Sequence, residues 1–175
     1  MGELVVWQRE HLHGVAGNSA ADNRAAQHRA ARIVPPENLH VTLAFLGSRP
    51  ANEKPAISRA LAEAAGAIGP VRLHPTAYRE GRSVGMIVCE DITGTATGLA
   101  ADLTERLERL GAYRRETRPW LPHITVLRFN DRPGLAPPVE NICSISVVRA
   151  ALYSSALRPS GAQYDVLETV ALGGR

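Results

Sequence analysis

Two apolar segments of the chain, PENLHVTLAFLG and WLPHITVLRF, each carry a histidine followed two residues later by a threonine. Both segments are predicted to be strands, and side chains alternate in direction along a strand. His40 is therefore expected to share a face with Thr42, and His123 with Thr125. The aliphatic residues between them point the other way. Each strand is thus expected to have one dry face, packed on a core, and one face with an imidazole and a hydroxyl.

This combination of side chains suits the cleavage of a phosphodiester. Two imidazoles can divide the work of general acid and general base, because histidine titrates near neutral pH. Threonine hydroxyls can donate hydrogen bonds to phosphoryl oxygens whose charge rises in the transition state. One His-x-Thr strand alone would more often hold a histidine bonded to a neighbour. Two copies favour catalysis, and because no carboxylates accompany them we expect no metal and no cofactor.

Helices and strands mix along the chain, and several strands are adjacent in sequence, which favours an α+β fold over a doubly wound sheet. Each half contains strands, a helix and one His-x-Thr strand, so two pseudo-symmetric lobes are expected. The predicted helices cover residues 20–31, 55–68 and 97–110. The predicted strands cover residues 4–7, 36–47, 71–78, 83–90, 120–129, 142–155 and 163–172.

Composition narrows the class of protein. The chain has 175 residues, of which 45% are hydrophobic and 21% charged, as expected for a single globular domain over residues 1–175. Its net charge of +3 permits an anionic substrate. The two cysteines are far apart and predict free thiols in a reducing, cytoplasmic location. Neither a membrane span nor a signal peptide is predicted, and we expect a monomer.

The segments RIVPPENLHVTLAFLG and RPWLPHITVLR resemble the two signature motifs of the 2H phosphoesterase superfamily. More narrowly, they are similar to the RNA 2′,3′-cyclic phosphodiesterases, also named 2′-5′ RNA ligases. The tail LYSSALRPSGAQYDVL is similar to the last strand pair of that family. The resemblance covers about residues 32–173. It implies a bilobal fold of mainly antiparallel sheet, with helices packed outside and a groove between lobes that each supply one motif.

The resemblance also implies an activity and roles for residues. The expected reaction is hydrolysis of a 2′,3′-cyclic phosphate at an RNA 3′ end to a 2′-phosphate. His123 would act as the proton acceptor that activates water, and His40 as the proton donor to the departing oxygen. Thr42 and Thr125 would bind the phosphate. Further candidates for substrate contacts are Arg128, Arg118, Arg82 and Tyr164. Parity points Arg128 away from the face of His123, and a strand bulge or the end of the strand could turn it back.

The N-terminal segment departs from the family pattern, which opens with a strand of the type Arg-x-Phe-x-Ala. Alternatives to hydrolysis of RNA ends also remain open. The same groups could run the reverse reaction, 2′-5′ ligation, or act on a small cyclic nucleotide or 2′-5′ oligoadenylate. A noncatalytic module that binds RNA ends is a further alternative. His11 and His13 suggest a zinc site only weakly, because no third ligand is near them in sequence.

Overall fold

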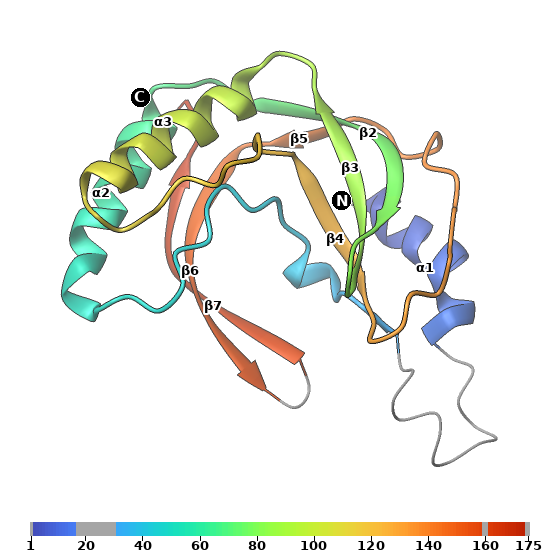
Figure 1. Ribbon diagram of the computed structural model, residues 1–175. Helices are drawn as coiled ribbons and strands as arrows, with labels where there is room; N and C mark the ends of the chain where they lie inside the picture. The colour runs from blue at the N-terminus through green and yellow to red at the C-terminus, as the bar shows by residue number, and fades with distance from the viewer. Residues whose placement is uncertain (1, 17–30, 159–160, 174–175) are drawn as a thin grey trace. The chain divides into compact units, whose positions relative to one another are not determined.

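The computed structural model describes residues 2–16, 31–158 and 161–173 (Figure 1). The helix expected over residues 20–31 lies outside the described residues, except for its last position. The helices are α1 (Gly2–Ala16), α2 (Lys54–Gly66) and α3 (Thr95–Arg109), with short 3-10 turns η2 (Pro36–Asn38) and η3 (Ala51–Glu53). The strands are β1 (Arg32–Ile33), β2 (Val71–Glu80), β3 (Val84–Asp91), β4 (His123–Arg128), β5 (Ile145–Val147), β6 (Arg149–Arg158) and β7 (Gly161–Ala171).

The described strands form two sheets. One has five strands in the order β1-β4-β3-β2-β5, and the other is the hairpin of β6 and β7. β4 lies between β1 and β3 and is antiparallel to both. β6 and β7 are also antiparallel along their whole length. The expected α+β class with antiparallel sheet is therefore confirmed.

The chain divides into two compact units. Unit 1 contains residues 1–42, 74–90 and 121–145, and unit 2 contains residues 43–73, 91–120 and 146–175. Both His-x-Thr motifs belong to unit 1. This differs from the expectation that each lobe supplies one motif. The physical reason is that the first motif pairs with the strand that carries the second, as described below.

In unit 2, α2 packs against α3 and against the β6–β7 hairpin. Figure 1 shows the two helices side by side. Their buried residues recur at helical spacing, with Ile57, Leu61 and Ala64 on α2. On α3 the buried stripe is Leu99, Leu103 and Leu107. Both helices were predicted from this periodicity, and both are confirmed with ends that differ by one or two residues.

The N-terminal segment is helical, and the strand predicted over residues 4–7 is wrong. Leu4, Trp7 and Leu12 are buried, with exposed fractions of 3% or less. Their spacing of three and five residues, with buried Gln8 between them, places them on one face of a helix. The apolar run Leu4–Trp7 is too short to separate a helix from a strand by periodicity alone. The helix α1 packs on β1 in unit 1.

The segment over residues 36–47 is more irregular than the predicted strand. It begins with the turn η2, and of its residues only Val41 forms a strand bridge. Leu39 is buried as expected, but Phe45 is 75% exposed. Val41 and Leu43 are only half-buried, so the prediction of a dry face is confirmed for Leu39 and wrong for the segment as a whole. Pro35 and Pro36 have no N–H, which ends the pairing of β1 with β4 and allows the chain to turn.

Candidate active site

The first motif lies against the second through an antiparallel bridge between Val41 and Ile124. In an antiparallel pair, the residues that flank a bridge meet in reverse order. His40 therefore comes across from Thr125, and Thr42 across from His123. Ile124 points to the core and is only 2% exposed, and Val41, which pairs with it, is half-buried. The four motif residues share the opposite face of the sheet, and all four are partly exposed.

This register places the two histidines on a diagonal. Directly opposed residues in an antiparallel pair have Cβ atoms about 5 Å apart, and diagonal neighbours are about 7–8 Å apart. A diagonal of this length leaves room for one phosphate group between two imidazoles. The two threonines occupy the other diagonal, so their hydroxyls flank the same space. The sequence predicted the shared faces of each motif, and the bridge brings the two faces together within one sheet.

Both histidines are oriented by the same local hydrogen bond. Nδ1 of His40 lies 2.6 Å from the carbonyl oxygen of Asn38, and Nδ1 of His123 lies 2.9 Å from that of Leu121. A carbonyl oxygen only accepts, so Nδ1 donates in each ring. The neutral form of each ring therefore carries its proton on Nδ1. This leaves Nε2 as the nitrogen that gains or loses a proton during a reaction.

A bulge in β4 turns Arg128 toward the motif face. On β3, Gly85 pairs with Leu127 and Met86 pairs with Thr125, so Val126 is the extra residue of β4. Val126 and Leu127 are both fully buried, which interrupts the alternation of the strand. Beyond this point the alternation restarts, and Arg128 is exposed. Of the two alternatives for Arg128, a bulge or the end of the strand, the bulge is present.

Arg32 is a residue of this region that the sequence analysis missed. It is exposed on β1 and pairs directly with Arg128 across the β1–β4 ladder. Directly paired residues share a face of the sheet. The two guanidinium groups therefore add positive charge to the edge that carries the motifs. The signal in the sequence was its place as the first residue of the first signature segment, eight residues ahead of His40.

The other predicted contact residues lie outside the two motif segments. Arg82 is exposed in the turn between β2 and β3, within unit 1. Arg118 is exposed in unit 2, where its Nε donates to the Glu116 carboxylate over 2.9 Å. Tyr164 on β7, also in unit 2, packs edge to face with Tyr153 at a ring-centroid distance of 6.2 Å. Their contacts with a substrate stay predictions.

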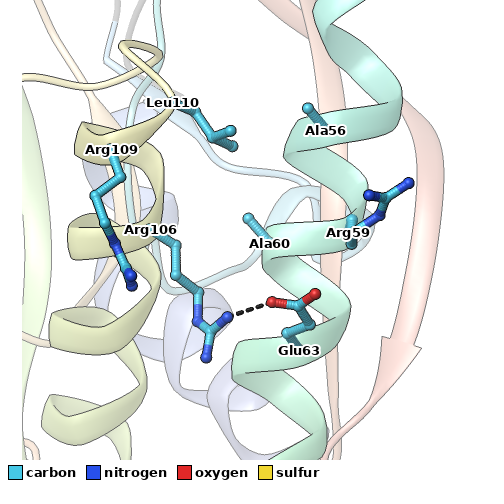
Figure 2. Close-up of a pocket in the computed structure, with 7 residues that line it drawn as sticks. All are labelled: Ala56, Arg59, Ala60, Glu63, Arg106, Arg109 and Leu110. Atoms are coloured by element: carbon cyan, nitrogen blue, oxygen red, sulfur yellow. Dashed lines mark hydrogen bonds and ion pairs between the residues drawn. The ribbon is translucent and has the colours of Figure 1, made fainter.

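A surface pocket of about 250 Å³ lies in unit 2 between α2 and α3, and no residue of the two motifs lines it. It is lined by Ala56, Arg59, Ala60, Glu63, Arg106, Arg109 and Leu110. Figure 2 shows the Arg106 guanidinium bonded to the Glu63 carboxylate across the pocket. Arg106 also contacts Asp102 at 3.0 Å. The charge of Arg106 is thus balanced by carboxylates, and its bond to Glu63 joins the two helices that line the pocket.

The described residues offer neither a metal cluster nor a membrane-spanning helix. No group of three or more histidine, cysteine or acidic side chains among them is arranged to hold a metal ion. His11 instead stacks on Trp7, and its Nδ1 lies 3.0 Å from the Trp7 carbonyl oxygen. Within the described ranges, no helix has both the length and the apolar character that a bilayer span requires.

Comparisons with known proteins show the family of this chain. A family model described as LigT-like phosphoesterase matches residues 18–76, which include the first motif. An RNA 2′,3′-cyclic phosphodiesterase of Thermus thermophilus is 32% identical over 163 residues, or 88% of this chain and 82% of the relative. The chain belongs to the LigT-like phosphoesterase family. It is therefore an enzyme of the 2H phosphoesterase group, as the two motifs suggested.

Solved structures show the same fold. The crystal structure of the Thermus thermophilus protein TT0787 matches with a TM-score of 0.70 and 33% identity, over 87% of this chain and 86% of that one. Escherichia coli LigT in complex with 3′-AMP matches with a TM-score of 0.74 and 25% identity, over 99% of this chain and 91% of LigT. The similarity to LigT extends over the N-terminal segment, which departs from the family pattern in sequence.

Proposed function

We propose that this phosphoesterase hydrolyses 2′,3′-cyclic phosphates at RNA 3′ ends and leaves a 2′-phosphate. The observation that carries the proposal is the Val41–Ile124 bridge, because it brings both His-x-Thr motifs onto one face of one sheet. The name of the Thermus relative, RNA 2′,3′-cyclic phosphodiesterase, supports the substrate class. The nucleotide in the LigT complex supports a site that accepts nucleoside phosphates.

The two histidines divide the proton transfers. His123 accepts a proton from water through Nε2, and the water oxygen forms a new bond to phosphorus. The bond between phosphorus and the 3′ oxygen breaks, and His40, which enters the reaction as the doubly protonated imidazolium, donates its Nε2 proton to that oxygen. The products are a 2′-phosphate and a 3′-hydroxyl, so atoms and protons balance. The Nδ1 bonds to Asn38 and Leu121 keep Nδ1 protonated in both rings. Nε2 of neutral His123 is then free to accept a proton, and Nε2 of the His40 imidazolium carries the proton that it donates.

The remaining groups act on the phosphate and the RNA. The hydroxyls of Thr42 and Thr125 donate to the non-bridging oxygens, which gain charge as the transition state forms. Arg128 adds a positive charge on the same face, beyond the bulge. Arg82, Arg118 and Tyr164 are proposed to contact the RNA chain rather than the reacting phosphate. The mechanism assigns no role to a metal ion.

The test uses 2′,3′-cyclic AMP and a short RNA with a cyclic phosphate end, in excess chelator. We expect turnover to 2′-phosphates, identified by chromatography against 2′- and 3′-phosphate standards. His40→Ala and His123→Ala should each lower kcat by about 10²–10⁴-fold. His74→Ala is the matched control, because His74 is an exposed histidine of the same unit that bonds Ser144.

Four results would contradict the proposal. Folded histidine variants with full activity would remove the two-imidazole mechanism. A 3′-phosphate product would contradict the assigned bond cleavage, because it requires departure of the 2′ oxygen in place of the 3′ oxygen. Loss of activity in chelator, restored by one added metal, would show that the reaction depends on that metal. Binding of cyclic ends without turnover would support the noncatalytic alternative.

A further inference from the structure

Gln8 is a buried polar residue of α1 that the proposed mechanism does not use. Its side chain is 2% exposed, on the helix face that packs in unit 1. Its Nε2 donates one hydrogen bond to the carbonyl oxygen of Val34 and one to that of Val126, each over 3.1 Å. An amide nitrogen has two hydrogens, so these two bonds use its full donor capacity. Buried polar groups with such complete bonding hold their partners in place.

The first acceptor, Val34, is the last residue before the chain leaves β4. Its N–H donates to the Val126 carbonyl over 3.0 Å, but Pro35 and Pro36 have no N–H to continue the ladder. The chain then forms η2, from which Asn38 orients the His40 ring, and pairing resumes at Val41. Gln8 therefore holds the backbone carbonyl of Val34, the last residue before the segment with the first motif leaves β4.

The second acceptor, Val126, is the extra residue of the β4 bulge. This bulge separates Thr125 from Arg128 and sets the face to which Arg128 points. The Val126 carbonyl receives two donors, the Val34 N–H and the Gln8 amide. One side chain of α1 is thus bonded to the backbone at both features that shape the site, the departure at Val34 and the bulge at Val126.

Other contacts keep α1 in place without Gln8. Leu4 and Leu12 are buried, and Trp7 Nε1 donates to the Pro138 carbonyl over 2.6 Å. The Glu3 carboxylate accepts a hydrogen bond from the backbone N–H of Cys143. Removal of the Gln8 amide alone should therefore leave the helix docked. Its effect should then appear in the geometry of the β4 edge.

We propose that Gln8 is a positioning residue, which aligns the first motif and Arg128 through the backbone of Val34 and Val126. This inference rests on the proposed function of the site. Gln8 does not touch the substrate. Small displacements of reacting groups have large effects on rate, and an error of 1 Å can cost about a hundredfold. The residue that fixes both segments is therefore expected to control turnover.

The test compares Gln8→Met, which keeps the length of the side chain without its donors, with Leu12→Ala in the same helix core. Leu12 is fully buried and does not bond either strand. Steady-state hydrolysis of 2′,3′-cyclic AMP is measured at a temperature where circular dichroism shows every variant folded. We expect kcat of Gln8→Met to fall by about 10–100-fold, with a smaller change in KM, and kcat of Leu12→Ala to change by less than about threefold.

A double-mutant cycle separates positioning from stability. If Gln8 acts partly through the bulge, Gln8→Met should lower kcat less in an Arg128→Ala background than in the wild type. Equal loss in both backgrounds, together with an equal loss in Leu12→Ala, would overturn the proposal. Gln8→Asn keeps the amide but shortens its reach, and it replaces Gln8→Met in this test if that variant does not fold. A lower kcat than that of Leu12→Ala is again the expected result, and an equal kcat would again overturn the proposal.

The outcomes also distinguish this inference from the function on which it rests. A wild-type protein without cyclic phosphodiesterase activity would refute the proposed function. An active wild type together with a fully active Gln8→Met would refute the positioning role alone. A large loss of kcat in Gln8→Met, with activity retained in Leu12→Ala, would support both.

Discussion

Gly85 lies on β3 opposite the bulge of β4, and Gly85→Ala should destabilise the protein. A Cβ atom at this position would lie 2.8 Å from Cζ and 3.0 Å from Cε2 of Tyr78, and closer still to its hydroxyl oxygen. The ring of Tyr78 cannot move away from the added Cβ without losing two contacts. Its hydroxyl donates to the Glu80 carboxylate over 3.3 Å, and its ring lies 6.1 Å from that of Trp7.

The size of the effect follows from these contacts. Forcing extra atoms into a packed site costs about 1–3 kcal/mol. Burial and the Glu80 carboxylate raise the pKa of Tyr78, so its hydroxyl stays protonated and its bond to Glu80 holds it over Gly85. Each kcal/mol shifts the midpoint of thermal unfolding by about 2–4 °C in a chain of this size. We therefore expect the midpoint to fall by about 2–12 °C.

Thermal and urea unfolding, followed by circular dichroism, measure this change. The control is Gly98→Ala in α3, where an added Cβ meets nothing within 4 Å. That substitution should raise stability by about 0.5–1 kcal/mol, because alanine favours a helix over glycine. Tyr78→Leu should recover part of the loss in the Gly85→Ala background. A Gly85→Ala protein as stable as the wild type would refute the steric reasoning.

Three further results are expected. Burial raises the pKa of the Cys89 thiol from 9.0 to about 11, so the unfolded chain loses this proton first. The free energy of unfolding should therefore fall by about 2–3 kcal/mol in total as pH rises from 9.0 to about 11. Urea unfolding of Cys89→Val over the same pH range should show a smaller fall in this free energy. Cys143 is exposed and should react with a thiol reagent before the buried Cys89. The Glu3 carboxylate raises the pKa of Cys143 and so lowers its thiolate fraction, and Glu3→Gln should therefore speed the reaction. Arg128→Ala should raise KM for 2′,3′-cyclic AMP by about tenfold, whereas ion-paired Arg118 should change it by less than about twofold when replaced by alanine.

Where the sequence has clear periodicity, the fold was predictable. α2 and α3 each carry an aliphatic stripe at helical spacing, and the alternating segments around the REGR turn form the β2–β3 hairpin. The tail was expected as one strand pair, and β6 and β7 form it, although β5 is a separate short strand of the other sheet. In these elements local sequence and packing favour the same structure.

The N-terminus and the first motif were harder to predict, for physical reasons. α1 has an apolar run of four residues that fits a helix or a strand, and only its packing on β1 decides between them. The segment after Pro36 has the alternation of a strand, but two prolines prevent regular pairing at its start. The predicted pairs within each motif followed from strand geometry. The meeting of the two motifs depends on a bridge between residues 83 positions apart, which no local pattern contains.

The bond from each histidine to a carbonyl two residues upstream has a consequence for how the enzyme should be probed. In many hydrolases a separate acidic side chain fixes the imidazole, and its replacement by alanine exposes that role. Here the peptide backbone does this work at both motifs. Exchange of neighbouring side chains leaves the acceptor in place, so an alanine scan would not detect it. Amide-to-ester replacement of the peptide bond that contains the accepting carbonyl, made by chemical synthesis, is the substitution that would reveal the contribution.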